Sequence, residues 1–229
     1  MAPSAVRAGR EVRVFRPSAP EIHPERILRI QGYSDLNRVR PVIRRAAESM
    51  AAIAARMSVP AVAYRRVPIH ALEGEVLEVE GARFTCLAFS RQLAGCVAIS
   101  PFVLSVGDPI PQRVVALAEA GDLLEGLLLE TAGWLAIEDA TRKFKVRLRG
   151  EALERGERIT SRMGPGYSYK VAGRMHTWSL EEQRGLFALF EGAATPAQLM
   201  ASCAMTPKLS RSGLYGLAPT DESTPRSDT

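Results

Sequence analysis

The longest regular pattern in this sequence is helical, and it extends from Asp122 to about Arg155. Residues of similar character recur along it at intervals of three or four, which is the spacing of one face of an α-helix. That face consists of Leu124, Leu127, Leu128, Thr131, Leu135, Glu138 and Arg142. We predict one long helix here, broken or kinked near Gly150. The strand-like segments of the chain lie before and after it.

The helical face places a carboxylate, Glu138, in line with apolar residues. A carboxylate beside apolar surface needs a partner. Periodicity alone favours an ion pair with Arg142, one turn further along the helix. A functional role for the carboxylate is the other interpretation.

The N-terminal third of the chain predicts an arm followed by a helix. Residues 1–24 mix proline, arginine and small residues, and we expect an arm with a short strand from Glu11 to Phe15. Asp35 is predicted to cap a helix from about Leu36 to Met57. Pro41 falls in the first turns of that helix, where proline is tolerated.

Strand patterns dominate the next part of the sequence. Residues 59–85 have alternating apolar positions with glycines at the expected turns, so they predict strands of a sheet with one solvated face. Residues 87–95 suit a short helix. Residues 96–105 carry few charges and predict a strand buried on both faces. A further helix is expected over residues 111–121.

Residues 158–178 form a loop rich in glycine and proline, unlike an ordinary core segment. The Gly-Pro-Gly turn at residues 164–166 lets the backbone approach another molecule while holding a fixed bend. Arg162 and Tyr167 stand at its two ends. Such a loop suits an anionic or planar ligand, and a simple surface turn is an equally good interpretation.

The C-terminal part predicts a helix, two strands and a tail. Ser179 and Glu182 have the spacing of a capping box at the start of the helix. Residues 197–205 and 211–218 read as strands joined as a hairpin or a crossover. Residues 219–229 are polar and contain proline, so we expect a disordered tail.

The net charge of +5 is unevenly distributed along the sequence. Residues 1–66 hold thirteen basic and five acidic residues (+8), residues 67–140 three and eleven (−8), and residues 141–229 fourteen and nine (+5). Few aromatic residues interleave with the basic ones, which argues against a nucleic-acid platform. The basic residues can equally form a docking face for an acidic protein partner.

Composition excludes several other classes. The 229 residues, 46% of them hydrophobic, can bury a substantial core. The longest apolar stretch, Leu123–Ile137, contains two glutamates and is too short to cross a bilayer, so we expect a globular cytoplasmic protein without a membrane association. Cys86, Cys96 and Cys203 are odd in number and lack CxxC spacing, which predicts buried thiols.

Three motifs together resemble the reactivation domain of cobalamin-dependent methionine synthase. They are the RMGPGY segment (162–167), the capped helix (179–192) and the ending SCAMTPKLSRSGLYG (202–216). In that family an Arg-x-x-x-Gly-Tyr segment precedes a strand, a Met-x-Pro step and a Ser-x-Ser-Gly turn that leads to a tyrosine. In this sequence the Met-x-Pro step is Met205 and Pro207, the Ser-x-Ser-Gly segment is Ser210, Ser212 and Gly213, and the tyrosine is Tyr215.

The resemblance implies a fold and a domain organisation. The expected fold is α+β: a single domain with a twisted, largely antiparallel sheet flanked by helices. The order of elements matches from residue 25 to residue 217, so we expect an arm (1–24), an activation-like domain (25–218) and a tail (219–229). The chain is most similar to short, free-standing proteins that contain only this domain.

The resemblance also implies a ligand, S-adenosylmethionine, and residues that bind it. Carried over by position, these are Glu138, Arg162, Gly164, Gly166, Tyr167 and Tyr215. A guanidinium suits the ligand's carboxylate because it donates paired hydrogen bonds. The helix glutamate would contact the ligand's amino acid portion. The family's N-terminal ligand-binding aspartate has no clear match, and Asp35 is the nearest candidate.

The implied function is reactivation by reductive methylation of cob(II)alamin. In such a reaction the protein positions the methyl group and supplies no acid, base or nucleophile, so no catalytic or metal-binding residue is expected. The sequence lacks a DxHxxG corrinoid motif, which predicts a separate corrinoid protein or split methionine synthase as partner and a flavodoxin-type electron donor. A non-catalytic S-adenosylmethionine-binding module, or an enzyme that uses this ligand in another reaction, are the alternatives.

Overall fold

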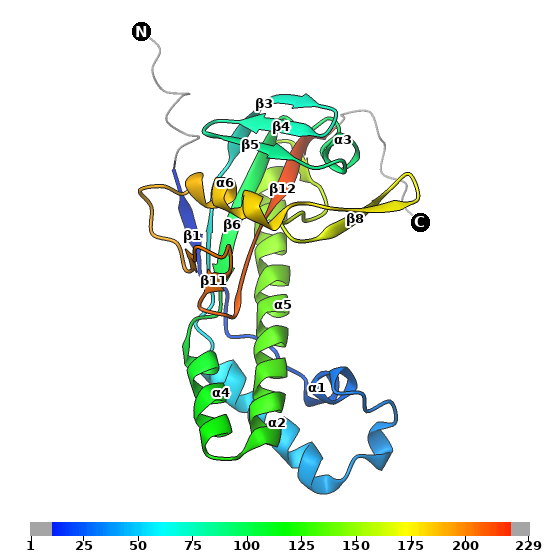
Figure 1. Ribbon diagram of the computed structural model, residues 1–229, viewed down its shortest axis with the longest axis vertical. Coiled ribbons are helices and arrows are strands. Elements are labelled where there is room, and N and C mark those ends of the chain that lie inside the picture. Colours follow the sequence, from blue (N-terminus) through cyan, green and yellow to red (C-terminus); the bar gives the residue numbers. More distant parts are fainter. Residues whose placement is uncertain (1–10, 221–229) are drawn as a thin grey trace.

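The computed structural model describes residues 11–220, in which an antiparallel sheet is flanked by helices (Figure 1). This is the α+β architecture that the resemblance implied. The eight strands of the sheet are β1 (Arg13–Phe15), β2 (Ala61–Tyr64), β3 (Val67–Glu73), β4 (Val76–Val79), β5 (Ala82–Thr85), β6 (Ala98–Ser105), β7 (Glu157–Ile159) and β12 (Ser210–Pro219).

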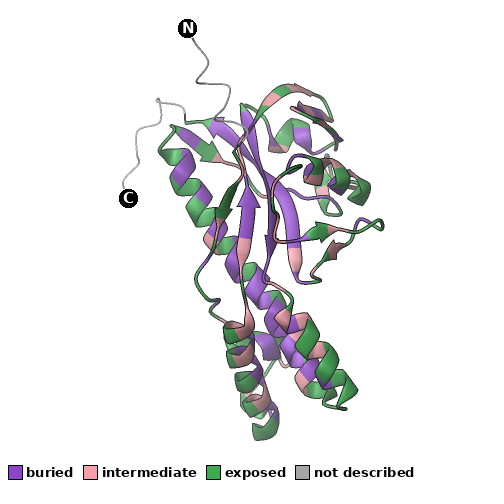
Figure 2. Ribbon diagram, turned by 90° about the vertical axis from the view of Figure 1, so that its left-hand side faces the viewer, coloured by how far each residue is buried: buried purple, intermediate pink, exposed green. Residues whose placement is uncertain are grey.

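Strand β6 is the centre of the sheet. One of its edges pairs with β2 and, further along, with β3, and the other edge pairs with β12 along its whole length. The C-terminal residues of β12, from Leu217 to Pro219, also pair with β7. All eight residues of β6 are buried, as its apolar sequence predicted, and β12 is buried over most of its length (Figure 2).

Helix α5 (Leu123–Leu153) runs from the helical end of the molecule up along the sheet (Figure 1). Helices α1 (Pro24–Ile30), α2 (Pro41–Met57) and α4 (Pro109–Glu119) pack around its N-terminal half. Its C-terminal half lies on one face of the sheet, where Phe144 contacts Tyr64 and Phe102. The predicted long helix is confirmed, but it continues unbroken through Gly150.

The opposite face of the sheet is covered by smaller elements. Helices α3 (Phe89–Gln92) and α6 (Gln183–Ala188) enclose a second apolar cluster there. The buried Trp178 contacts Phe84 and Phe89 edge to face. Both faces of β6 are therefore covered, which explains why its sequence carries few charges.

The start of helix α2 differs from the prediction. Helix α2 begins at Pro41, and Asp35 instead caps a separate 3-10 turn, η1 (Leu36–Arg38), by accepting from the N–H of Asn37. The reason is local: Arg40 precedes a proline and is held extended, at φ −55° and ψ 139°.

The predicted capping box at Ser179 is incomplete. The Ser179 hydroxyl accepts from the N–H of Glu181, and a short 3-10 turn, η2 (Leu180–Glu182), precedes α6. The Glu182 carboxylate is used elsewhere, because it accepts from the N–H of Thr85 and from the Trp178 indole. Tertiary contacts have replaced the local cap.

The C-terminal strands also pair differently from the prediction. The segment 197–205 contributes to a small hairpin of β10 (Gln198–Leu199) and β11 (Met205–Thr206), and β12 pairs with β6 and β7. The Ser-x-Ser-Gly segment lies inside β12 and is not a turn. A second hairpin, β8 (Ser168–Val171) and β9 (Arg174–Thr177), follows the glycine-rich loop.

The N-terminal strand is confirmed as β1. The N-terminal part of the arm, residues 1–10, and most of the predicted tail, residues 221–229, lie outside the described residues.

Near the C-terminal end of α5, Glu151 connects the helix to the sheet. Its buried carboxylate accepts from Tyr64 Oη (2.8 Å), Arg13 Nη1 (3.0 Å) and Arg147 Nε (2.6 Å). Burial alone would raise the pKa of Glu151. The hydrogen bonds from Tyr64 and Arg147 and the charges of Arg147 and Arg13 outweigh burial, so the pKa is lowered.

We expect Glu151 to make the fold sensitive to acid. A carboxyl whose pKa is lowered by folding stabilises the fold above its ordinary value of 4.5, and this contribution is lost as the pH falls through the lower folded-state pKa. Glu151→Gln should lower the free energy of unfolding in urea at pH 7 by about 1–3 kcal/mol. The difference from wild type should shrink toward pH 3.

The control is Glu154→Gln, an exposed position one residue beyond the same helix. It should follow the wild-type pH profile. A destabilisation of Glu151→Gln that stays constant from pH 7 to pH 3 would contradict this role.

Candidate functional site

The glycine-rich loop runs along the edge of β12 after β7 ends. The N–H of Thr160 donates to the carbonyl of Gly216 (3.0 Å). Met163 and Leu214 form an isolated β-bridge with reciprocal N–H···O bonds of 2.9 and 2.8 Å. This crossing leaves no room at Gly213, where an added Cβ would lie 2.3 Å from the Met163 carbonyl oxygen. The loop is therefore fixed to the sheet at Met163.

The two predicted glycines shape the turn that follows. The N–H of Gly164 donates to Tyr169 Oη (2.7 Å), and a Cβ at Gly164 would lie 3.1 Å from the Ser212 carbonyl. Gly166 has a φ of +81° and donates its N–H to the Trp178 carbonyl (2.8 Å). Positive φ favours glycine at that position. The glycines therefore serve close packing and turn geometry in addition to any role toward a ligand.

Arg162 and Tyr167 lie together at this turn. The Arg162 Cζ atom is 4.5 Å from the centroid of the Tyr167 ring, a cation–π contact. The Arg162 Nη1 atom is buried and has no hydrogen-bond partner within residues 11–220. A buried guanidinium nitrogen without an acceptor is unusual in a folded protein. It is a donor suited to an anionic group.

Glu138 pairs with Arg211 across the site, and not with Arg142. Arg142 binds Asp139 instead, so the ion pair expected from periodicity is wrong. Arg211 lies on β12, is 5% exposed and also donates to Thr141 Oγ1 (3.0 Å).

The environment keeps Glu138 ionised. The hydrogen bond from Arg211 lowers the pKa of Glu138, burial partly opposes this, and the charges of Arg211, Arg162 and Arg26 add to it. The Glu138 side chain is half exposed, and the hydrogen bonds formed within residues 11–220 engage only its Oε1. The carboxylate therefore offers a charged acceptor at the surface of the site.

Tyr215 forms the buried side of the cluster. Its ring stacks on Phe102 and contacts Phe144 edge to face. Burial raises the pKa of Tyr215, the charges of Arg162 and Arg211 lower it, and that of Glu138 raises it. The phenol thus lies within reach of all three charges.

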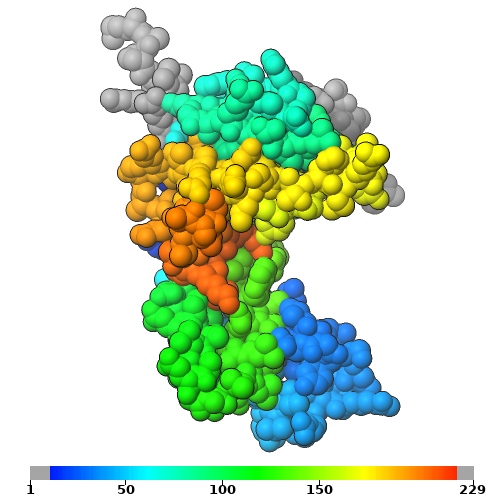
Figure 3. All heavy atoms as spheres, viewed as in Figure 1, coloured from blue at the N-terminus to red at the C-terminus, as the bar shows by residue number. Residues whose placement is uncertain are grey.

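Two cavities adjoin the Glu138–Arg211 pair. One, of about 290 Å³, is lined by Trp134, Tyr167, Leu180 and Arg211, among others. The other, of about 340 Å³, is lined by Glu138 together with Glu21, His23, Arg26, Asp139 and Arg142. In the space-filling view the C-terminal segment that lines the first cavity lies directly above the helical end of the molecule (Figure 3).

The predicted site residues therefore gather at one place, with one exception. Arg162, Gly164, Gly166 and Tyr167 form the loop wall, Glu138 lies on α5 and Tyr215 on β12. Of these six residues, Tyr167 lines the first cavity and Glu138 the second, and the other four line neither. Asp35, the candidate for the family's N-terminal aspartate, also lines neither cavity, and its carboxylate caps η1.

Sequence reasoning missed Arg211 and the packing role of Gly213. The signal for Arg211 was present, because it is a charged residue inside the otherwise uncharged run SRSGLYGLA. Its partner could not be predicted, since Glu138 lies 73 residues away.

Neither a metal-binding cluster nor a membrane-spanning helix occurs in the described part of the chain. Within residues 11–220, no group of three or more His, Cys, Asp or Glu side chains is placed to hold a metal ion. No helix in this range is both long and apolar enough to cross a membrane. The three cysteines are free thiols, two buried and one partly buried.

Comparison with known proteins identifies the fold. Neither a protein-family model nor a curated protein matches the sequence. Thirteen chains of solved structures match, among them the MetH reactivation domain bound to AdoHcy. That structure has a TM-score of 0.65 and 16% sequence identity, over 93% of this chain and 80% of that chain. The chain therefore shares the fold of the domain whose motifs its sequence resembles.

Proposed function

We propose that this protein binds S-adenosylmethionine at the cluster of Glu138, Arg162, Gly164, Gly166, Tyr167 and Tyr215, and that it is a stand-alone reactivation factor for a separate corrinoid protein. The observation that carries the binding proposal is the Arg162 Nη1 atom, buried and without an acceptor in the described chain. The neighbour in fold, which is bound to AdoHcy, supports a ligand of this class.

The residues divide between the two charges of an amino acid. Arg162 would hold the carboxylate, because a guanidinium donates paired hydrogen bonds to it. Glu138 would hold the ammonium, since its carboxylate is ionised and the bonds within the described chain leave Oε2 available. The Tyr167 ring and the backbone around Gly164 would form the wall against the rest of the ligand. The ligand supplies a methyl group on a sulfonium, and the protein's task is to orient it.

The surface around the site supports a protein partner. Trp134, Tyr167 and Leu180 line the 290 Å³ cavity while remaining substantially exposed, with Trp134 at 52%. Exposed aromatic and aliphatic side chains beside a cavity are typical of interaction surfaces. We propose that a corrinoid protein or a split methionine synthase docks here, with a flavodoxin-type donor supplying the electron. The cytoplasmic location stays a prediction.

Two experiments test the function in order. Calorimetry of the wild-type protein with S-adenosylmethionine should show binding, and no binding at millimolar ligand would refute the whole proposal. The protein is then mixed with a cob(II)alamin-loaded corrinoid protein, a reductant and S-adenosylmethionine. The visible spectrum should show methylcobalamin only when all components are present.

The second experiment also separates the alternatives. Binding without formation of methylcobalamin would contradict the reactivation role and favour a non-catalytic binding module or an enzyme with another reaction. A control without this protein sets the background rate of methylation.

A further inference from the structure

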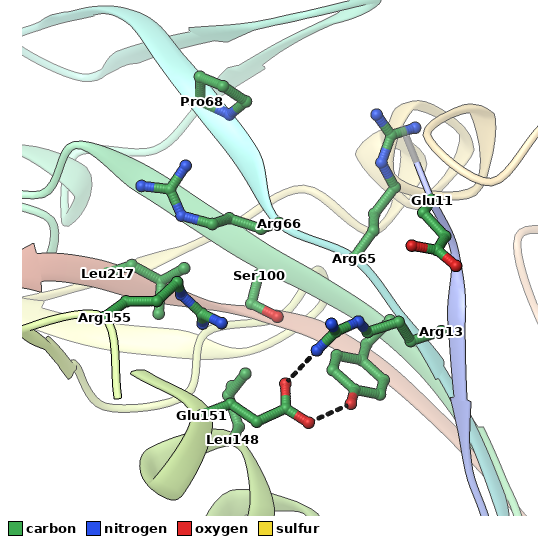
Figure 4. A pocket seen from close by; sticks show the side chains of 11 residues that line it. Glu11, Arg13, Arg65, Arg66, Pro68, Ser100, Leu148, Glu151, Arg155 and Leu217 are labelled. Atoms are coloured by element: carbon green, nitrogen blue, oxygen red, sulfur yellow. Dashed lines mark hydrogen bonds and ion pairs between the residues drawn. The ribbon is translucent and has the colours of Figure 1, made fainter. Parts of the chain in front are cut away.

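A further polar cavity lies at the C-terminal end of α5, whereas the site described above adjoins the middle of that helix. It has a volume of about 400 Å³ and opens between the C-terminal end of α5 and the sheet, beside the edge strand β1 (Figure 4). Glu151 lines it, whereas Glu138 belongs to the first site, and thirteen helical residues separate the two by about 20 Å. The proposed function makes no use of this cavity.

A buried hydroxyl faces the cavity. Ser100 lies on the central strand β6, is 1% exposed and lines the cavity wall. Its Oγ atom has no hydrogen-bond partner within residues 11–220. Figure 4 shows its hydroxyl in the middle of the cavity, among the surrounding guanidinium groups. A buried hydroxyl without a partner is costly, which indicates a polar group that it would bind.

The charges around the cavity do not balance. Glu151 is paired with Arg13 and Arg147, and Glu157 with Arg66 and Arg155. Four guanidinium groups thus share two buried carboxylates, leaving two positive charges in excess. The exposed Glu11 at the cavity reduces the excess to one, while the fifth arginine nearby, Arg65, is matched by Glu80.

Several guanidinium donors at the cavity are not used by these ion pairs. Arg155 engages Glu157 through Nε only, so both of its Nη atoms remain. Arg66 uses Nε and Nη2, and Arg13 uses Nη1. The remaining donors and the Ser100 hydroxyl surround one space. Paired guanidinium donors match the oxygens of a phosphate group.

We propose that this cavity binds a small phosphomonoester, with Ser100, Arg13, Arg66 and Arg155 holding its phosphate group. A phosphomonoester is an anion of about −1.5 to −2 charges at neutral pH, and the positive charge in excess at the cavity would attract it. A phosphate ion alone is much smaller than a cavity of this volume. The organic part of the ligand would lie against Pro68, Leu148 and Leu217, which complete the lining.

The test is calorimetry with two probes, inorganic phosphate and glycerol 3-phosphate, in a phosphate-free buffer at constant ionic strength. Wild-type protein should bind both, and glycerol 3-phosphate more tightly. Ser100→Ala removes one hydroxyl without changing the packing volume much, and it should weaken binding several-fold. Arg155→Gln should weaken binding at least tenfold, because it removes two charged donors.

The matched control is Arg149→Gln, which removes the same charge from an exposed position of α5 that does not line the cavity. It should bind both probes as wild type does. Equal affinities of Ser100→Ala, Arg155→Gln and wild type would overturn the proposal. The proposal would also be overturned if neither probe gave a heat of binding at millimolar concentration. This holds even if an oligonucleotide bound to the protein instead.

Binding of glycerol 3-phosphate at this cavity should be independent of the proposed S-adenosylmethionine site. Arg162→Ala should bind glycerol 3-phosphate with wild-type affinity. Saturating the wild-type protein with glycerol 3-phosphate should leave its affinity for S-adenosylmethionine unchanged. Competition between the two ligands would overturn the assignment of two separate sites.

Discussion

Replacing Arg162 with alanine is expected to weaken the binding of S-adenosylmethionine by at least about 30-fold while leaving the protein folded. The substitution would leave the ligand's carboxylate without its charged donors. Truncating one member of a buried, hydrogen-bonded charge pair costs about 2–5 kcal/mol, which corresponds to a loss of affinity of roughly 30- to 5,000-fold. Calorimetry measures the affinity, and thermal unfolding measures the stability.

The fold should tolerate this change. Within the described chain the Arg162 side chain contributes a cation–π contact with Tyr167, worth about 0.5–1 kcal/mol, and its Nη1 atom forms no hydrogen bond. Arg162→Lys keeps the charge without the planar fork and should bind with intermediate affinity. Arg174→Ala, at an exposed position of β9, is the control for loss of charge alone. Wild-type affinity in Arg162→Ala would contradict the proposed role of this residue.

Replacing Gly213 with alanine is expected to destabilise the protein strongly. The new methyl group would lie 2.3 Å from the Met163 carbonyl oxygen and 3.3 Å from the Phe102 ring. The nearer contact is backbone, which cannot rotate away, so the crossing of the loop and β12 must separate. We expect a loss of at least about 3 kcal/mol, the upper end of the usual cost of overpacking. For a chain of this size, each kcal/mol of lost stability lowers the thermal midpoint by roughly 2–4 °C. The thermal midpoint should therefore fall by about 6–12 °C.

A second glycine provides the control for this substitution. Gly150 lies within helix α5, and a Cβ there would meet nothing within 4 Å. Gly150→Ala should stabilise the protein by about 0.5–1 kcal/mol, because alanine has the higher helix propensity. If Gly213→Ala were as stable as Gly150→Ala, the Met163 crossing would not have the geometry described.

Local patterns in the sequence predicted the parts of the fold that local physics controls. The α5 helix and the buried strand β6 follow from their hydrophobic periodicity and their lack of charge. Helix α2 was predicted about one turn too long because the extended residue before Pro41 separates it from η1. The capping box failed because a distant strand uses the carboxylate of Glu182.

The candidate site was predictable in part. Arg162 and Tyr167 stood out because a Gly-Pro turn interrupts the surrounding regular patterns. The partner of Glu138 could not be predicted, since periodicity offers only residues of the same helix and Arg211 comes from β12. The cavity at the C-terminal end of α5 was not predicted at all, because its arginines come from three separate segments of the chain.

Strand β12 has a consequence for the energetics of binding. It carries Arg211 and Tyr215, and its edge holds the loop at Met163. The loop, Arg211 and Tyr215 are therefore all anchored to one buried strand before any ligand binds. Ordering a free loop would cost about 1–2 kcal/mol per residue in conformational entropy, and a pre-ordered wall avoids most of that cost. A ligand held by a few charged contacts can then bind tightly, with little change in the hydrogen-exchange protection of the loop backbone.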